Sequence, residues 1–138
     1  MASNAACIFC KIVRREIPSK VLFETEHCLA FLDVGPLSEG HTLVIPKHHA
    51  QYLHELPDEQ MIDLLPTAKK VATAIGCKNY NVLQNNGRIA HQAVDHVHFH
   101  VIPKPNQNEG LNIQWDPKEG VNLDNTIKNL NLPTVTRL

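Results

Sequence analysis

The sequence predicts an α+β domain, in which a mainly antiparallel five-stranded sheet carries one long helix and a short N-terminal helix. Three observations favour this class. Five short apolar runs are separated by turn residues, as in strands joined by short connections. One longer stretch repeats its apolar residues with the period of an α-helix. The chain has 138 residues, 43% of them hydrophobic, which suits one domain with its own core.

The N-terminal third is expected to form a helix and three strands. The segment IFCKIVRREIP (Ile8–Pro18) mixes charged and apolar residues at helical spacing and stops at its proline. VLFET and CLAFLDV then predict two strands joined by a tight turn around residues 26–27. The turn residues of GPLSEG predict a loop, and HTLVIP (His41–Pro46) predicts a short, mostly buried strand.

The long helix is expected in LPDEQMIDLLPTAKKVATAIG, residues 56–76. Pro57 suits the first helical position and Gly76 suits the C-terminal cap. An apolar stripe near the 3.6-residue period is formed by Met61, Leu64, Leu65, Ala68, Val71 and Ile75. Pro66 lies inside this stretch, so we expect a bend there.

Two more strands complete the predicted sheet. YNVLQN predicts one strand, the loop NGRIAHQA follows, and VDHVHFHVIP predicts the last strand. The chain then becomes polar, with a weak helix expected near Asp124–Asn131. We therefore expect a single domain over residues 1–138, with its core at about 7–115 and a polar tail at 116–138.

Charge and composition narrow the functional classes. The formal net charge of −1 gives no basic face, which argues against a nucleic-acid polymer as partner but leaves room for a small anion. No apolar run reaches the ~18–20 residues of a membrane span, and the first residues do not resemble a signal peptide. Four cysteines in a chain that looks intracellular argue against a disulfide framework. We expect a cytoplasmic protein without membrane contact, with the nucleus as a further compartment.

Histidines at alternate positions are the main functional signal. His96, His98 and His100 would share one face of a strand, while Val97, Phe99 and Val101, on the other face, would enter the core. Such a row suits a metal site, because neighbouring imidazoles can reach one ion.

The row also suits a phosphate site, in which a neutral ring attacks phosphorus and a cationic ring beside it donates to phosphate oxygens. Asn85, Gln92 and the backbone amides of the preceding loop could donate to the same oxygens. The residues alone leave both alternatives open.

The segment HVHFHVI (His96–Ile102) resembles the signature of the histidine triad superfamily, His-x-His-x-His-x-x with apolar x. The match extends to CIFCKIVRREIPSKVLFETEHCLAFLDV, GHTLVIPKHH and VLQNNGRIAHQAVDH, which resemble the Hint branch, the histidine triad nucleotide-binding proteins. The resemblance covers about residues 7–115. It implies the HIT-like fold and a homodimer whose sheets join across the interface.

The resemblance also implies an activity. Hint proteins bind purine mononucleotides and hydrolyse nucleoside phosphoramidates such as adenosine 5'-phosphoramidate, and aminoacyl-adenylates. His98 would be the nucleophile and would form a nucleotidyl-histidine, from which water releases AMP or GMP. His100 would lie against the phosphate and the leaving group. His41 would support the triad histidines without touching the substrate.

The same resemblance implies the binding residues. Asn85, His91, Gln92 and Ala93 would line the phosphate pocket, and Asp33 and Val34 would hold the ribose and base. Many relatives carry Ser or Thr where this chain has Ala93, so only a backbone amide can assist there, and we expect weaker assistance to the leaving group.

A zinc site is expected at the N-terminus. Cys7 and Cys10 have the C-x-x-C spacing of a metal site. The resemblance implies that His49 and His96 complete a closed structural site, with His48 as the competing candidate beside His49. The alternative is that both cysteines are free thiols.

Two other functions remain open from the sequence. One is a dinucleoside polyphosphate hydrolase, although that branch tends to have Gln in place of Asn85 and lacks the C-x-x-C motif. The other is a nucleotide-sensing adaptor whose catalysis is incidental, because binding and catalysis would use the same pocket.

Overall fold

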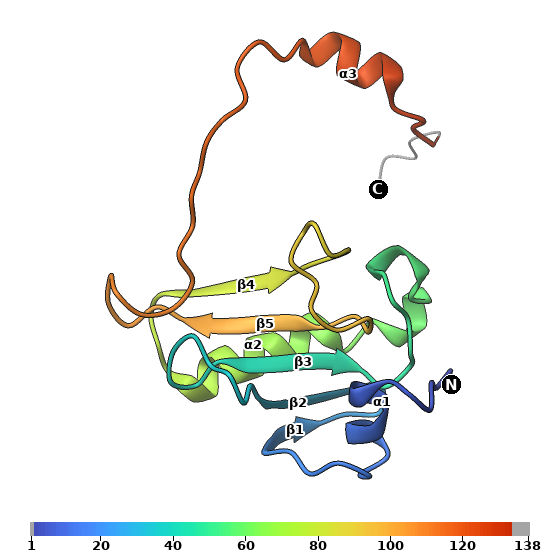
Figure 1. The fold of residues 1–138 in the computed structure, drawn as a ribbon, viewed down its shortest axis with the longest axis vertical. Coiled ribbons are helices and arrows are strands. Elements are labelled where there is room, and N and C mark those ends of the chain that lie inside the picture. The colour runs from blue at the N-terminus through green and yellow to red at the C-terminus, as the bar shows by residue number, and fades with distance from the viewer. Residues whose placement is uncertain (1, 134–138) are drawn as a thin grey trace.

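The computed structural model describes residues 2–133 and confirms the α+β class, with a five-stranded antiparallel sheet (Figure 1). Its elements in chain order are α1 (Ile8–Val13), β1 (Val21–Glu24), β2 (Cys28–Leu32), β3 (Thr42–Pro46), α2 (Leu64–Ile75), β4 (Tyr80–Gln84), β5 (Phe99–Pro103) and α3 (Leu123–Asn129). The strand order is β1-β2-β3-β5-β4, so β5 lies between β3 and β4, and β4 forms one edge of the sheet. Within residues 2–133, no helix has the length and apolar character that a membrane span requires.

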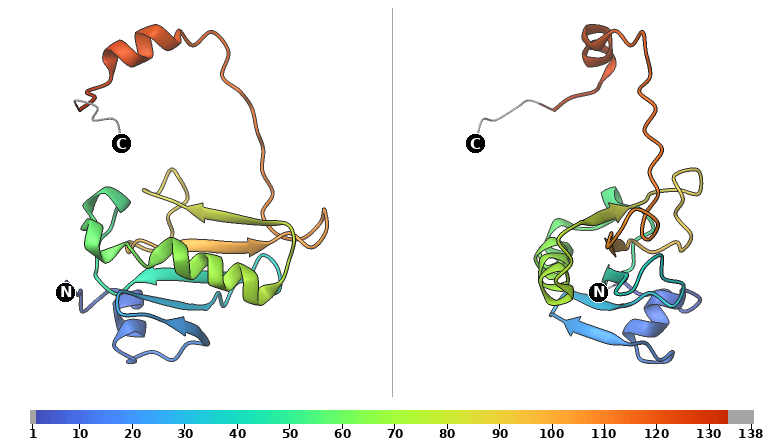
Figure 2. Two further views of the ribbon diagram at one scale, coloured as in Figure 1. Left: turned by 180° about the vertical axis from the view of Figure 1, so that it is seen from behind. Right: turned by 90° about the vertical axis from the view of Figure 1, so that its left-hand side faces the viewer.

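The two faces of the sheet carry separate hydrophobic clusters. Helix α2 covers one face (Figure 2), and its Leu64, Ala68 and Val71 pack with Val44 and Val101 of the sheet. On the opposite face α1 contributes Phe9 and Ile12, which pack with Leu29, Phe31, Leu43 and Ile45. Because side chains alternate along a strand, β5 sends Val101 toward α2 and His100 toward the face that carries α1.

Helix α1 is shorter than the sequence predicts. It ends at Val13, where we expected it to continue to Pro18. Arg15 has a positive φ of 61°, and the amides of Glu16 and Ile17 both bond back to the carbonyl of Lys11. A residue in the left-handed conformation ends the helix here, as glycine usually does. Arginine rarely adopts this conformation, so the residue type does not predict the end.

Helix α2 begins later than predicted. Pro57 precedes a short 3-10 turn at Asp58–Gln60, and the α-helix starts at Leu64 and ends, as expected, with Gly76 in the left-handed conformation. Pro66 is therefore the third residue of the helix. At this position a backbone N–H has no acceptor within the helix, so a proline breaks no helical hydrogen bond. The bend that we expected at Pro66 therefore has no physical reason.

Strand β5 also begins later than predicted, at Phe99, so the first two histidines of the triad precede it. The amide of His96 bonds to the carbonyl of Val94, and that of Val97 to the carbonyl of Ala50. These bonds hold the segment against neighbouring loops. Val97 and Phe99 still pack in the core under α2, as the alternation predicts.

A C-terminal arm, residues 111–133, leaves the sheet after β5 (Figure 1). It begins at a turn in which the Gly110 amide donates to the Leu37 carbonyl. Gly110 has a φ of +86°, and a Cβ there would lie 2.5 Å from the Pro103 carbonyl oxygen, so this position requires glycine. The arm carries α3, close to the helix expected at Asp124–Asn131.

Candidate active site

Strands β3 and β5 bring two histidines into contact. The antiparallel register pairs Thr42 with Val101 and Leu43 with His100, so His41, just before β3, lies near His100. The Nε2 atom of His41 is 2.9 Å from Nδ1 of His100. Two residues 59 positions apart in the chain thus form one hydrogen-bonded pair.

The hydrogen bonds of this pair assign the protons of both rings. The backbone amide of Leu37 donates to Nδ1 of His41 at 3.1 Å, so neutral His41 carries its proton on Nε2. That proton is donated to Nδ1 of His100. Neutral His100 therefore carries its own proton on Nε2, as a hydrogen-bond donor.

Asp33, His41 and His100 also bring possible ligand atoms within 4.8 Å of one another. Asp33 Oδ2 lies 3.5 Å from His41 Nε2. Because the Leu37 amide occupies Nδ1 of His41, the Nε2 atom keeps its proton and has no lone pair for a metal. The contact with Asp33 and His100 is therefore a hydrogen-bonding arrangement.

His98 has the opposite tautomer. Its Nδ1 is 2.7 Å from the carbonyl oxygen of His96 and can only donate to it, so the lone pair of neutral His98 is on Nε2. The ring is 4% exposed, and its centroid lies 5.2 Å from that of Phe9 and 5.0 Å from that of His100. A potential nucleophile and an N–H donor therefore stand side by side.

Burial keeps these rings neutral. It lowers the pKa of His41 and of His98, and lowers the pKa of His100 to about 4, where the neighbouring His98 and His41 add to the effect. The expected pairing of a neutral ring with a cationic neighbour at neutral pH is therefore wrong for the nucleotide-free protein.

A cavity of about 390 Å³ opens beside the two rings, between α1 and strands β2 and β3. Its lining is mostly apolar and consists of Ile8, Phe9, Ile12, Ile17, Pro18, Ser19, Phe31, Leu32, Asp33, Val34, Leu43, Ala93, Val94, His98 and His100. Apolar walls with a few convergent polar groups are typical of small-molecule sites. Five of the residues that we expected in the site therefore share this cavity: Asp33, Val34, Ala93, His98 and His100.

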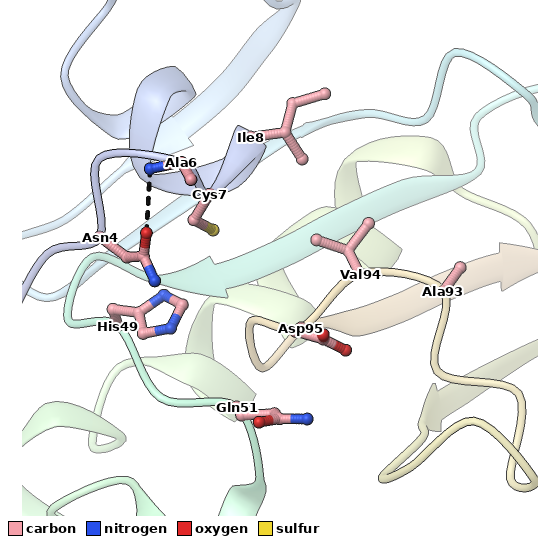
Figure 3. Close-up of a pocket in the computed structure, with 9 residues that line it drawn as sticks. All are labelled: Asn4, Ala6, Cys7, Ile8, His49, Gln51, Ala93, Val94 and Asp95. Carbon is pink, nitrogen blue, oxygen red and sulfur yellow. Dashed lines mark hydrogen bonds between the residues drawn. The ribbon is translucent and has the colours of Figure 1, made fainter.

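A second cavity of about 460 Å³ adjoins the first, because Ile8, Ala93 and Val94 line both. In Figure 3 it lies between Asn4 and His49 on one side and Ala93, Val94 and Asp95 on the other. The phosphate end of a nucleotide near His98 would thus have open space beyond it.

The loop before the triad differs from our expectation at Gln92. Its side chain is buried, accepts from the Gly87 amide at 2.7 Å and donates to the Gln51 carbonyl at 2.7 Å. Its own backbone amide donates to the Gly87 carbonyl. Gln92 therefore braces the loop: its side-chain oxygen, one of its two side-chain N–H groups and its backbone amide are all engaged within the protein.

Other loop residues also have defined places. The Asn85 side chain donates to the carbonyl of His91, a residue with a positive φ of 74°, and neither lines the cavity. Within residues 2–133, the backbone amides of Ala93 and Val94 make no hydrogen bond, and both residues line the cavity. These two N–H groups are the donors that the loop offers.

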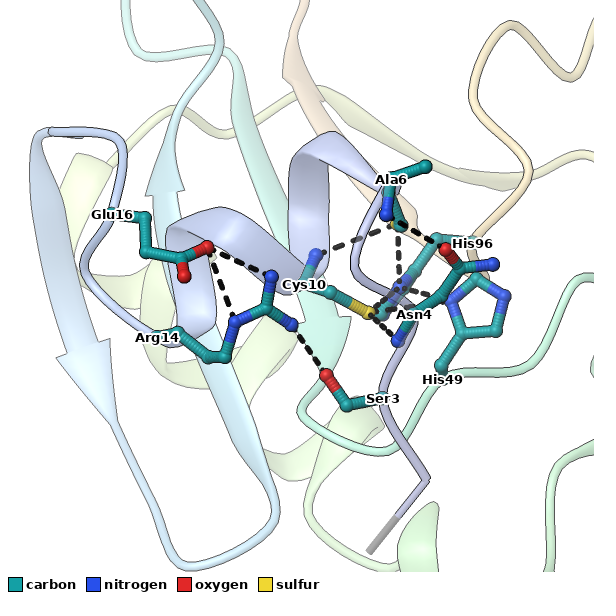
Figure 4. A network of polar contacts seen from close by, with 9 residues as sticks. Ser3, Asn4, Ala6, Cys10, Arg14, Glu16, His49 and His96 are labelled. Carbon is teal, nitrogen blue, oxygen red and sulfur yellow. Dashed lines mark hydrogen bonds and ion pairs between the residues drawn. The ribbon is translucent and has the colours of Figure 1, made fainter.

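A second cluster gathers four residues from three segments: Cys7 and Cys10 at the start of α1, His49 after β3 and His96 before β5. Cys10, His49 and His96 are labelled in Figure 4. Cys7 Sγ lies 3.4 Å from His96 Nδ1, and Cys10 Sγ lies 3.4 Å from His49 Nδ1 and 3.6 Å from His96 Nδ1. The two Nδ1 atoms are 3.1 Å apart. His48 instead accepts a hydrogen bond from the Ala2 amide, so the structure brings His49, and not His48, to the cysteines.

The spacing of these atoms suits a tetrahedral zinc ion. Typical Zn–S and Zn–N bond lengths require ligand separations of about 3.3 Å between two nitrogens and about 3.5 Å between sulfur and nitrogen. The distances of 3.1 Å and 3.4–3.6 Å agree. His96 Nε2 donates to the Pro46 carbonyl at 2.8 Å, which leaves its Nδ1 lone pair directed at the cluster.

Sequence reasoning missed two groups that shape this site. The Leu37 amide sets the tautomer of His41, and the Phe9 ring makes T-shaped contacts with the rings of His96 and His98. A backbone amide leaves no signal in a sequence. The only hint of Phe9 is its place between the two cysteines of C-x-x-C, which holds it close to the cluster of Cys7, Cys10, His49 and His96.

Comparison with known proteins identifies the family. Residues 14–107 match the HIT domain family. The adenosine 5'-monophosphoramidase hnt1 of Schizosaccharomyces pombe is 64% identical over 110 residues, which cover 80% of this chain and 83% of that protein. The crystal structure of the histidine triad nucleotide-binding protein from Candida albicans has 49% identity and a TM-score of 0.82 and covers 89% of this chain and 91% of that one.

A zinc-bound histidine triad family protein from Mycobacterium smegmatis is a further structural neighbour, with 35% identity and a TM-score of 0.71 over 82% of this chain and 84% of that one. The triad geometry, the family match and the level of identity agree with one another. The chain is a member of the HIT domain family.

Proposed function

We propose that this chain hydrolyses purine nucleoside 5'-phosphoramidates, among them adenosine 5'-phosphoramidate and AMP-lysine, and also aminoacyl-adenylates, in which the bond to phosphorus that breaks is P–O, and that it releases AMP or GMP. One observation carries the proposal: the Nε2 lone pair of His98 lies beside the Nε2–H of His100 on the wall of one cavity. The fission yeast relative, named an adenosine 5'-monophosphoramidase, supports the substrate class.

The chemistry follows from the two tautomers. The lone pair of His98 Nε2 attacks the α-phosphorus, the P–N bond breaks, and the amine takes up a proton as it leaves. The negative charge of a bound phosphate raises the pKa of His100 from about 4, so this ring can supply that proton. Water then attacks the phosphorus, the bond to His98 breaks, and the mononucleotide is released.

The rest of the cavity binds the nucleotide. The free amides of Ala93 and Val94 donate to phosphate oxygens, which stabilises charge that develops during the attack. The Asp33 carboxylate accepts from ribose hydroxyls, and the apolar wall near Val34 contacts the purine. Asn85, His91 and Gln92 fix the loop that presents these amides.

The variant His98→Ala tests this function. It removes the nucleophile, so turnover of adenosine 5'-phosphoramidate should fall by about three orders of magnitude or more, while the Kd of AMP stays within about tenfold. His54→Ala is the matched control, because His54 is exposed and stacks on Tyr52, outside the cavity. Wild-type turnover in His98→Ala would refute the mechanism.

We also propose that Cys7, Cys10, His49 and His96 hold one structural zinc ion. The distances within the cluster support this set. The backbone amides of Asn4 and Cys10 donate to the sulfurs of Cys10 and Cys7, which favours thiolates. The zinc-bound mycobacterial neighbour adds support from within the family. When bound, the metal ties α1 to the segment that carries the nucleophile, and it takes no part in the reaction.

A homodimer is proposed through β4. This strand lies at the edge of the sheet, and Tyr80 and Val82 on it are 45% and 46% exposed. An uncovered strand edge of this kind is a template for pairing with a second strand. Antiparallel pairing of β4 with the β4 strand of a second copy joins the two sheets into one, as the resemblance to Hint proteins implies.

A further inference from the structure

Arg88 is a cation that the proposed mechanism does not use. Its Nη1 atom donates to the carbonyl oxygens of Gln92 and Ala93, at 3.0 and 2.7 Å. Its Nη2 atom lies 3.0 Å from Oδ1 of Asp95. Arg88 lines neither of the two adjoining cavities. One guanidinium group therefore contacts three residues of the loop before the triad without entering the space beside His98.

The planarity of the peptide bond turns these contacts into a constraint on two amides. In a trans peptide, the carbonyl of one residue and the N–H of the next residue point in opposite directions. The carbonyls of Gln92 and Ala93 belong to the same peptide units as the N–H groups of Ala93 and Val94. Because Arg88 holds both carbonyls, the two N–H groups point away from the guanidinium, and both residues line the cavity beside His98.

The position of the guanidinium is itself well determined. The Gly87 amide donates to the side chain of Gln92, and the Gln92 amide donates back to the Gly87 carbonyl, so the backbone at Arg88 is held next to the loop. Asp95 holds the second terminal nitrogen and so restrains rotation of the planar group. Arginine offers its donors in a rigid fork, which suits a role in which direction matters.

The proposed chemistry gives a reason for this arrangement. Ala93 has no side-chain donor, so at this position only the backbone N–H can bind a phosphate oxygen. Such a donor lowers the barrier when it is oriented in advance toward the charge that develops in the transition state. A positive charge at the carbonyl end also polarises both peptide units in the direction that strengthens their N–H donors.

We propose that Arg88, held by Asp95, is a positioning residue of the phosphate site. It orients the N–H groups of Ala93 and Val94 toward the phosphate oxygens and does not touch the substrate. This inference rests on the proposed phosphoramidase activity. Loss of Arg88 should therefore slow the attack on phosphorus more than it weakens the binding of AMP.

The variant Arg88→Met tests the proposal, because it keeps an unbranched side chain and removes every donor. The side chain is 64% exposed, so the substitution leaves the core intact. We expect kcat/KM for adenosine 5'-phosphoramidate to fall about tenfold or more, while the Kd of AMP changes by less than about threefold. Arg15→Met is the matched control, because Arg15 is comparably exposed and pairs with Glu24 outside the cavity.

Two further variants separate orientation from charge. Arg88→Lys keeps the charge but lacks the planar fork, so its kcat/KM should stay closer to that of Arg88→Met than to that of the wild type. Arg88→Ala leaves space for a free guanidinium ion, which should restore part of kcat/KM, whereas ammonium should not. Wild-type kcat/KM in Arg88→Lys would overturn the role of the fork.

Nuclear magnetic resonance tests the positioning without turnover. In the nucleotide-free protein, the amide order parameters of Ala93 and Val94 should be about 0.85, as in rigid backbone, and should decrease in Arg88→Met but not in Arg15→Met.

The proposal is overturned if Arg88→Met leaves kcat/KM or these order parameters unchanged, or if the Kd of AMP rises as much as kcat/KM falls. A wild type without turnover would refute the proposed function instead, and the order parameters would still decide whether Arg88 orients this loop.

Discussion

At the scale of single residues, the tautomers of three histidines account for the proposed chemistry. A hydrogen bond from the Leu37 amide determines the tautomer of His41, and His41 in turn determines that of His100. The carbonyl of His96 determines the tautomer of His98. Each ring thus presents a defined atom. The Asp33 carboxylate also contacts this group, with its Oδ2 atom 3.5 Å from His41 Nε2.

The lowered pKa of His98 gives a testable pH dependence. Protonation of Nε2 removes the lone pair that attacks phosphorus, and burial lowers the pKa of this ring, so the lone pair remains available below the pH at which a free imidazole is protonated. We expect kcat/KM for adenosine 5'-phosphoramidate to fall on acidification with a midpoint below 6.5, after subtraction of the non-enzymatic hydrolysis. A midpoint at or above 6.5, the value of a free imidazole, would contradict this description of the site.

The lowered pKa of His100 affects stability with a defined sign. The unfolded chain binds a proton at His100 near pH 6.5, whereas the folded chain binds it only near pH 4. The free energy of unfolding should therefore decrease as pH falls from about 6.5 to about 4, and level off at lower pH as far as this group is concerned.

The proposed catalytic residues could be predicted from the sequence better than the residues that support them. His98 and His100 follow from the triad motif and His41 from the resemblance of GHTLVIPKHH, and the structure brings all three together. The role of Gln92 could not be predicted, because a glutamine that braces a loop and one that binds phosphate look the same in a sequence. Burial decides between them, and burial depends on the whole fold.

At the scale of elements, α1 matters because it closes both sites. Its Phe9 and Ile12 line the cavity beside His98 and His100, while Cys7, at its N-cap, and Cys10 belong to the cluster of two cysteines and two histidines. The element types were predictable from apolar periodicity, but the element ends were not. Arg15, with its positive φ, ends α1, and hydrogen bonds to loop carbonyls hold the residues before Phe99 outside β5. Both boundaries depend on tertiary contacts.

The zinc proposal is tested on α1. Protein purified without a histidine tag should contain about one zinc per chain by plasma emission spectrometry, and Cys10→Ser should lose it and lower the melting temperature. Cys77→Ser is the matched control, because Cys77 lies outside the cluster and donates only to the Asn79 carbonyl. Less than about a tenth of an equivalent of zinc in the wild type would refute the site.

At the scale of the whole molecule, the single chain leaves two features without a partner. The edge of β4 is uncovered, and the arm exposes apolar faces at both its extended and its helical part. A polar tail was the expectation from composition. The structure shows instead that the tail has an apolar stripe on α3, which a count of polar residues does not reveal.

The central claim is that His98 Nε2 forms a bond to phosphorus, and rapid chemical quench with peptide mass spectrometry tests it directly. During turnover of adenosine 5'-phosphoramidate, the peptide that contains residues 96–100 should carry one adenylyl group, with fragment ions that place it on His98. The label should be absent from His98→Ala. The account would be contradicted if no adenylylated peptide were found in the steady state of a variant in which hydrolysis of the adenylyl-histidine is slowed. A label on His100 would also contradict it.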